Sequence, residues 1–96
     1  MRNSSALRFE FDPSKSATNK AKHGLDFVEA QALWKGDRIR LSAKTVEGEA
    51  RWALIGKIGD HHHTVIVTYR GASIRIISAR PSSKNEIEIY ERNKKS

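Results

Sequence analysis

Two apolar strands joined by a tight turn are encoded by Thr68-Tyr69-Arg70-Gly71-Ala72-Ser73-Ile74-Arg75-Ile76-Ile77-Ser78-Ala79-Arg80. A two-residue hairpin turn at Gly71-Ala72 pairs Thr68 directly with Arg75. Because paired residues lie on the same face of a sheet, Arg70 and Arg75 are expected to share one face with Thr68. Strand positions normally supply a core, so this hairpin predicts a sheet that carries cations on one of its faces.

The two faces of the hairpin differ in chemistry. The face opposite the arginines is expected to pack in the core, and it carries Val65, Val67, Tyr69, Ile74 and Ile76. Arg80 has the opposite parity to Arg75 and precedes Pro81, so it is expected at the strand end, reaching round the sheet edge. Guanidinium groups bind phosphate bidentately and stay charged, so Arg70, Arg75 and Arg80 favour a phosphodiester-binding surface. The alternative is that they pair with glutamates or protect an exposed edge.

The remaining pattern predicts a small α+β domain with the order β-α-α-β-β-β-β-α. The predicted elements are a strand at 7–11, helices from Pro13 to about Lys22 and from Asp26 through Trp34, strands at 38–43, 51–58, 64–70 and 73–80, and a last helix opened by Ser83. Short connections between the four later strands favour an antiparallel meander with the helices packed on it. Residues 1–96 are expected to form one domain with a core of about 7–92.

Capping residues fix the predicted helices. Asp12-Pro13 supplies an N-cap acceptor and a proline at the first helical position, and Gly24 can end that helix in the left-handed conformation. This first helix is so polar that only a narrow stripe through Ala17 and Ala21 is expected to be buried. Ser83 with Glu86 forms a capping box for the last helix.

Composition narrows the function. The chain has 96 residues, of which 18 are Lys or Arg and 11 are Asp or Glu, giving a net charge of +7 and a pI near 10.1. Such a balance is typical of proteins that bind polyanions, although an acidic protein partner fits equally well. The absence of cysteine excludes disulfides and thiolate chemistry. No apolar run approaches the ~20 residues of a membrane span, and we expect a cytoplasmic protein without a membrane partner.

Two neighbouring residues at the end of the first predicted helix are candidates for acid–base chemistry and phosphate binding. The helix dipole favours cations there, and the imidazole of His23 titrates near neutrality. His23 is therefore a candidate general base or general acid, while Lys22 is a candidate phosphate contact. The alternative is that His23 only caps the helix and Lys22 is solvated.

The turn at Glu47-Gly48-Glu49 and the last helix supply further candidates. Arg51 is placed to hold substrate, with Glu49 as a base or as its orienting partner, although ordinary hairpin chemistry explains the same residues. Tyr90 is a candidate for base stacking or proton donation, and packing of its ring against the sheet is the alternative.

The run His61-His62-His63 does not predict a metal centre. Three adjacent residues do not all point toward one ion, and neither cysteine nor a spaced carboxylate shell completes a site. Phosphate-binding, dinucleotide and serine-nucleophile motifs are also missing from the sequence. We therefore expect no metal and no cofactor.

An ordered set of motifs resembles the BrnT toxins of bacterial type II toxin-antitoxin systems. The resemblance runs from about Phe9 to Tyr90 and is carried by Phe9-Glu10-Phe11-Asp12-Pro13-Ser14-Lys15, Asn19-Lys20-Ala21-Lys22-His23-Gly24-Leu25-Asp26-Phe27-Val28-Glu29-Ala30, Gly48-Glu49-Ala50-Arg51-Trp52 and Ile74-Arg75-Ile76-Ile77-Ser78-Ala79-Arg80. Single pieces such as Lys-His-Gly mean little, whereas the ordered set is specific.

The resemblance implies a RelE-like ribonuclease fold and toxicity through cleavage of mRNA, which blocks translation. It implies cleavage without a metal, in which the ribose 2′-hydroxyl attacks the adjacent phosphate. It also implies neutralisation by a BrnA-like antitoxin of the ribbon-helix-helix type, with operator DNA bound only through the toxin-antitoxin complex. A non-catalytic module that binds nucleic acid or antitoxin through the same basic face is the alternative.

The resemblance implies roles for the candidate residues in RNA cleavage. Arg70, Arg75 and Arg80 would stabilise the charge of the phosphorane, supported by Arg51 and Lys22. His23 would be the first choice for moving either proton, with Glu49 as reserve base and Tyr90 as reserve acid.

Overall fold

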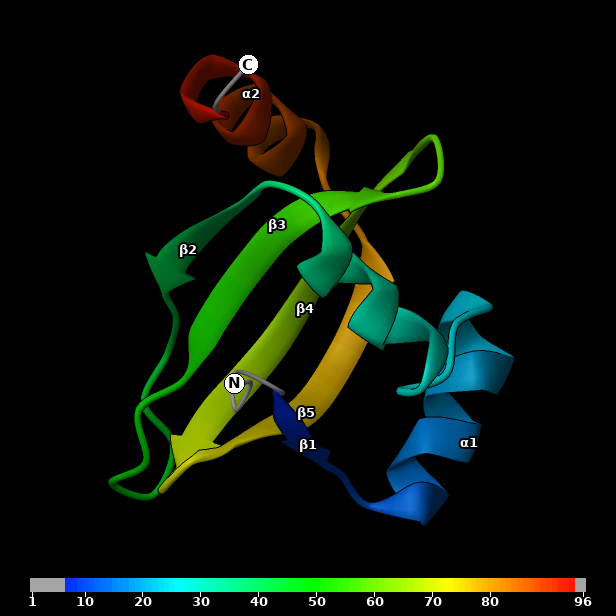
Figure 1. Cartoon of the computed structure of the whole chain (residues 1–96), viewed down its shortest axis with the longest axis vertical. Coiled ribbons are helices and arrows are strands. Elements are labelled where there is room, and N and C mark those ends of the chain that lie inside the picture. The colour runs from blue at the N-terminus through cyan, green and yellow to red at the C-terminus, as the bar shows by residue number, and fades with distance from the viewer. Residues whose placement is uncertain (1–6, 95–96) are drawn as a thin grey trace, which may run out of the picture.

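A computed structural model describes residues 7–94 of the chain (Figure 1). Its elements are β1 (Arg8–Glu10), α1 (Pro13–His23), the 3₁₀ helix η1 (Glu29–Lys35), β2 (Arg38–Ser42), β3 (Trp52–Ile58), β4 (His61–Arg70), β5 (Ser73–Pro81) and α2 (Lys84–Asn93). The predicted order of elements is therefore confirmed. The main difference in extent is at β4, which begins at His61 because Gly59 and Asp60 complete the turn before it.

The strands form one five-stranded sheet in the order β1-β5-β4-β3-β2. The predicted α+β class is confirmed, but the sheet is mixed and the expectation of a purely antiparallel meander was wrong. Neighbours from β2 to β5 are antiparallel, whereas β1 pairs with β5 in parallel. The argument from short turns holds only for β2 to β5. Because α1 and η1 separate β1 from β2, the first strand is free to join the far edge of the sheet.

The predicted register of the arginine hairpin is confirmed, but a bulge changes the position of Arg80. Thr68 pairs with Arg75, and Thr64 pairs with Arg80. The register shifts by one residue at Ile77, opposite the step from Ile66 to Val67. A bulge of this kind inserts one unpaired residue into a strand and so reverses the parity beyond it. Arg80 therefore lies on the same face as Arg75, not on the opposite one.

The hydrophobic core lies between η1 and the other face of the sheet. Its buried members are Leu25, Phe27, Ala30, Leu33, Leu54, Val65, Val67, Ile74, Ile76 and Ala79. η1 crosses this face in front of the central strands (Figure 1). The spacing of three between Phe27, Ala30 and Leu33 suits a helix of three residues per turn, because residues three apart then align on one side. The predicted amphipathic segment is confirmed, but as a 3₁₀ helix.

The contact between η1 and the sheet depends on a glycine. A Cβ on Gly56 of β3 would lie 3.0 Å from the carbonyl oxygen of Asp37 and 3.1 Å from the Leu33 side chain. Only a residue without a side chain allows so close an approach, which brings Leu33 directly against β3.

Helix α1 packs beside β5 through buried polar residues, so the expected stripe through Ala17 and Ala21 was wrong. The buried positions are Ser16 and Asn19. The Asn19 amide donates to the carbonyl oxygens of Leu25 and Ala79, both at 2.7 Å, and its carbonyl accepts from the Ala79 N–H at 3.3 Å. A polar side chain can be buried when its hydrogen bonds are satisfied. The carboxamide thereby occupies both backbone groups of Ala79 in β5, beyond the end of β1.

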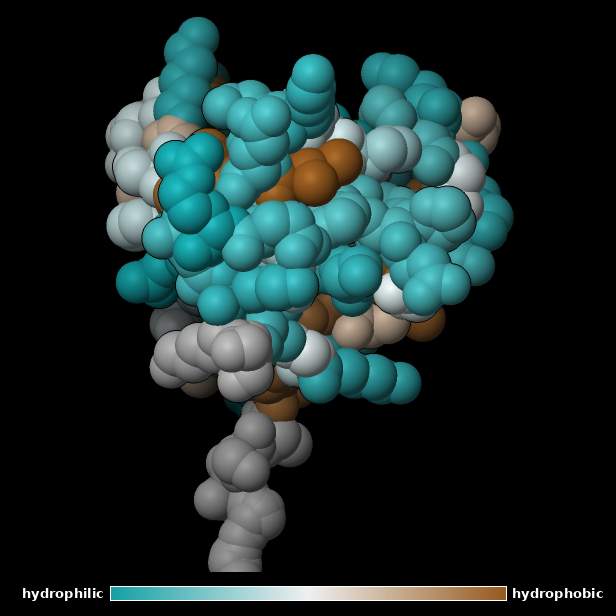
Figure 2. Space-filling view, turned by 90° about the horizontal axis from the view of Figure 1, so that it is seen from above, coloured by the Kyte–Doolittle hydropathy of each residue, from teal (hydrophilic) through white to brown (hydrophobic). Residues whose placement is uncertain are grey.

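Helix α2 packs on the arginine face, at the end of the sheet that lies uppermost in Figure 1. The predicted capping box of Ser83 and Glu86 is present. Tyr90 is only 4% exposed, and its ring packs edge to face against His62 with 5.5 Å between centroids. Seen from this end, the surface is mainly hydrophilic (Figure 2). Within residues 7–94 no helix is long and apolar enough to cross a membrane.

Candidate functional site

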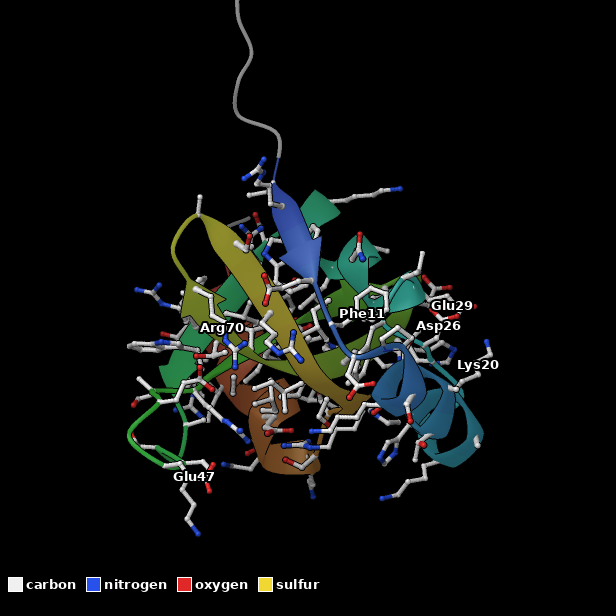
Figure 3. The ribbon with its side chains drawn as sticks, turned by 90° about the horizontal axis from the view of Figure 1, so that it is seen from below. Phe11, Lys20, Asp26, Glu29, Glu47 and Arg70 are labelled. Carbon is white, nitrogen blue, oxygen red and sulfur yellow. The ribbon has the colours of Figure 1, made fainter. Side chains whose placement is uncertain are left out.

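A hollow of about 120 Å³ lies on the arginine face between the 43–51 loop, β5 and the start of α1. We call it the arginine pocket, and it is lined by Asp12, Lys15, Glu49, Arg51, Arg70, Arg75, Ile76 and Ile77. Figure 3 views this side of the molecule from below, with Arg70 beside the β4–β5 hairpin and Glu47 in the neighbouring loop. The structure thus brings together Arg70, Arg75, Arg51 and Glu49 of the predicted site residues.

A tight turn places the residues of the 43–51 loop. Glu47 and Gly48 have φ values of 50° and 77°, and Val46 and Glu49 exchange backbone hydrogen bonds of 3.1 and 2.9 Å. Positive φ at both central residues is the geometry that joins antiparallel segments with the least splay. The turn directs the Glu49 carboxylate to Arg70, whose Nε donates to it at 3.1 Å.

Among the three arginines of the arginine pocket, Arg51 is the one without an ion pair in the described residues. Its Nε is buried, and within the described part of the chain it has no hydrogen-bond partner. An unpaired buried N–H costs free energy that an incoming acceptor recovers. Two neighbouring arginines are already paired, because Arg70 contacts Glu49 and Arg75 contacts Glu10 at 3.2 Å. Arg51 therefore keeps its charge unneutralised beside the two paired arginines.

A second hollow, of about 220 Å³, continues the arginine pocket along α1. It adjoins the first at Lys15 and Ile77, which line both, and its other lining residues are Thr18, Asn19, Lys22, His23 and Ser78. The two hollows form a basic groove, the name we use from here. Lys22 is exposed and His23 is half-buried. Sequence reasoning missed Lys15, although its spacing of seven residues from Lys22 places both on one side of the predicted helix.

Arg80 stands apart from the basic groove despite sharing its face. Its guanidinium binds the Glu86 carboxylate bidentately, with distances of 2.7 and 2.8 Å. Glu86 also accepts from the Thr64 hydroxyl and the Ser83 N–H. These donors, Arg80 first, lower the pKa of Glu86 from 4.5 to about 2 even though burial acts the other way. The alternative that the arginines pair with glutamates therefore describes all three of them, and in Arg80 the pair ties β5 to α2.

This ion pair gives stability a dependence on pH that can be measured. A carboxyl with a lowered folded-state pKa stabilises the fold above its ordinary pKa of 4.5, and the contribution is lost as pH falls toward about 2. We expect the free energy of unfolding of Glu86→Gln to fall less than that of the parent as the pH is lowered. Urea denaturation of both proteins over that pH range provides the measurement. Parallel pH profiles for the two proteins would contradict the assignment.

Tyr90 and the histidine run lie where α2 packs on β4, outside the basic groove. Tyr90 is buried against His62, so the packing alternative for its ring is the one that the structure favours. His62 contacts Glu91 at 2.8 Å, and His63 approaches the carbonyl of His61. Among residues 7–94 no three His, Cys, Asp or Glu side chains are grouped to hold a metal ion.

The fold and the site define the class of protein: a small α+β domain with a mixed sheet and a cationic groove on one face. Residues 11–86 match the family described as ribonuclease toxin, BrnT, of type II toxin-antitoxin system. This match covers most of the chain, which therefore belongs to the BrnT family of ribonuclease toxins. No curated protein matches it.

Proposed function

We propose that the chain cleaves RNA in the basic groove, with the scissile phosphate in the arginine pocket. The observation that carries this proposal is the buried, unpartnered Nε of Arg51 beside Arg70, Arg75 and Lys15. Charge develops on the phosphoryl oxygens as the transition state forms, and preorganised donors at that point are the main source of rate acceleration. Membership in a family of ribonuclease toxins supports the same substrate class.

The proposed reaction needs no external nucleophile. The ribose 2′-oxygen attacks phosphorus, the bond to the 5′-oxygen breaks, and a 2′,3′-cyclic phosphate and a 5′-hydroxyl result. One proton leaves the 2′-hydroxyl and one reaches the departing oxygen. We assign these transfers to His23 and Glu49, which lie in the two adjoining hollows of the groove. Arg51, Arg70 and Arg75 hold the phosphate, and Lys15 and Lys22 hold the strand beside it.

The roles of Arg80 and Tyr90 change in this proposal. Arg80 is a positioning residue for α2, since both oxygens of Glu86 already occupy its guanidinium. Tyr90 supports the same helix from its buried position. Neither residue lines the basic groove.

We further propose that the protein acts in the cytoplasm as a RelE-like toxin that blocks translation by cleaving mRNA. A BrnA-like ribbon-helix-helix antitoxin would neutralise it, and operator DNA would be bound through the complex. Membership in a type II toxin-antitoxin family implies a protein antitoxin. The resemblance of the sequence motifs to BrnT toxins supports the RelE-like activity, the mRNA substrate and the BrnA-like antitoxin.

A non-catalytic module is the second candidate function. It is favoured by the pairing of Arg70 with Glu49 and of Arg75 with Glu10, which reduces the charge available to a phosphate. Such a module would grip RNA or the antitoxin through Arg51 and the lysines without an acid or a base.

Cleavage in the presence of EDTA separates the two candidates. We expect RNA incubated with the purified chain to be cut in EDTA and to carry 2′,3′-cyclic phosphate ends. A substrate with 2′-deoxyribose at the cut position should stay intact, because the nucleophile is missing. Intact RNA that nevertheless shifts in a gel would support the binding module, and cleavage restored only by a divalent cation would contradict the metal-free route.

A further inference from the structure

A large groove lies on the face of the sheet opposite the basic groove. Its floor is formed by Leu54 and Ile74, its walls by Trp34, Arg38, Arg40 and Tyr69, and its volume is about 560 Å³. A second hollow of similar volume adjoins it at Leu7 and Trp34 and extends along η1 past Val28. We call the two together the aromatic groove.

The exposed large apolar side chains of residues 7–94 gather here. Leu7, Val28 and Tyr69 are 52%, 62% and 41% exposed, and each lines one of the two hollows. In Figure 2, apolar patches appear at the lower edge, on the side of the molecule that carries η1 in Figure 1. Contiguous exposed apolar surface on a small protein marks an interaction site more often than scattered single residues do.

Two arginines on β2 are fixed against the aromatic rings. The guanidinium of Arg40 lies 4.6 Å from the ring centroid of Trp52 and 6.0 Å from that of Tyr69. Arg38 lies 5.8 Å from the ring of Trp34 and donates to backbone carbonyls at 3.3 and 3.4 Å. Stacking holds a guanidinium in one orientation and leaves its in-plane donors for a carboxylate. Neither arginine has an ion-pair partner in the described residues.

We propose that the aromatic groove receives an amphipathic acidic segment of the antitoxin. This inference rests on membership in a type II toxin-antitoxin family, which implies a protein partner, and deepens the proposed function by placing that partner. Apolar side chains of the segment cover Leu7, Val28 and Tyr69, and its carboxylates bind Arg38 and Arg40. Asp37 is the one acid among the lining residues of the first hollow, against Arg38, Arg40 and Lys94, whereas Glu29 and Lys35 balance in the second. The charge of the first hollow is therefore complementary to an acidic segment.

Protein side chains fit this groove better than a nucleic acid does. Aromatic rings beside cations also form RNA-binding platforms, but here the guanidiniums of Arg38 and Arg40 cover the rings of Trp34 and Trp52, which leaves less ring surface for a base. The proposed phosphate contacts, Arg51 and Arg75, lie on the other face of the sheet. Antitoxin contact and RNA contact therefore use different residues, and substitutions should affect them separately.

A pair of charge reversals tests the placement. Arg40→Glu is expected to weaken binding of a BrnA-like antitoxin by at least about 10-fold, because a carboxylate then faces a carboxylate. Lys57→Glu makes the same change in net charge on an exposed position of β3, on the opposite face, and should leave affinity unchanged. Calorimetry gives the affinity, and thermal denaturation shows that each variant is folded. Val28→Asp, at an exposed position, provides a second variant that spares the stacked arginine.

RNA contact is measured on the same proteins with a 2′-O-methyl oligoribonucleotide, which binds without being cleaved. We expect Arg40→Glu to bind it within about twofold of the parent, and Arg75→Ala to lose it while keeping its antitoxin affinity. Equal antitoxin affinities for Arg40→Glu, Val28→Asp and Lys57→Glu would overturn the proposal. Loss of oligoribonucleotide binding in Arg40→Glu would also overturn it, because RNA would then occupy the groove. A change from dimer to monomer between the parent and Arg40→Glu in light scattering would overturn it too, because a second copy of the chain would then occupy the groove. If the parent binds antitoxin but cuts no RNA, only the proposed function fails.

Discussion

Replacing Arg51 by alanine is expected to lower the rate of RNA cleavage by about 100- to 1000-fold, the usual effect of losing one preorganised donor to a transition state. Arg51 lines the arginine pocket with its Nε buried and unpartnered among the described residues, whereas Arg70 and Arg75 each share charge with a glutamate. The loss should appear mainly in kcat, because the donor acts on charge that grows during the reaction. Single-turnover cleavage of a labelled RNA provides the rate.

Stability distinguishes this role from a structural one. Alanine removes a buried N–H without a partner and one cation from a cluster, so the free energy of unfolding should stay the same or rise. Arg80→Ala is the matched control on the same face, and it should do the reverse. Losing the bidentate contact leaves the Glu86 carboxylate without its cation and costs about 1–3 kcal/mol, while cleavage per folded molecule changes little. Arg51→Ala with full activity, or with a large loss of stability, would contradict the proposed site.

The hairpin shows how far local sequence rules reach. Gly71-Ala72 predicted the pairing of Thr68 with Arg75 correctly, because the turn sets the register of the strands it joins. The position of the bulge at Ile77 was not predicted, since Ile77 is the same residue type as Ile76 and the inserted position depends on how β5 meets β4. That single residue decided the face on which Arg80 lies. Local patterns thus predict pairing near a turn better than they predict it several residues away.

The site residues were predictable where charged residues lie next to a turn. They were less predictable where tertiary contacts determine which side chains are paired or buried. The Glu47-Gly48 turn identified the loop that carries Glu49 and Arg51, but only the fold shows that Arg51 is less satisfied than Arg70. Polarity was a misleading guide to burial on α1. Ser16 and Asn19 are buried because backbone groups distant in sequence satisfy them, and a helical pattern contains no information about such partners.

Asn19→Ala is expected to cost about 2–5 kcal/mol of folding free energy, because each buried backbone group left without a partner costs about 1–3 kcal/mol. The substitution removes the partner of the Leu25 carbonyl and of both backbone groups of Ala79. For a domain whose total stability is about 5–15 kcal/mol, this is a large share. Alanine has a higher helix propensity than asparagine, so this propensity alone would make the variant more stable. A loss of stability would therefore come from the missing hydrogen bonds.

Urea denaturation of Asn19→Ala and of Lys20→Ala measures the effect against a matched change on the same helix. Lys20 forms an exposed ion pair with Glu29 at 2.8 Å, and removing it should cost less than about 1 kcal/mol. Because Asn19 joins α1 to β5, its loss should also displace Lys15, Lys22 and His23 from the basic groove. We therefore expect cleavage by Asn19→Ala to fall even at temperatures where circular dichroism shows the sheet intact. Equal stability of the two variants would show that α1 is held against the sheet by other contacts.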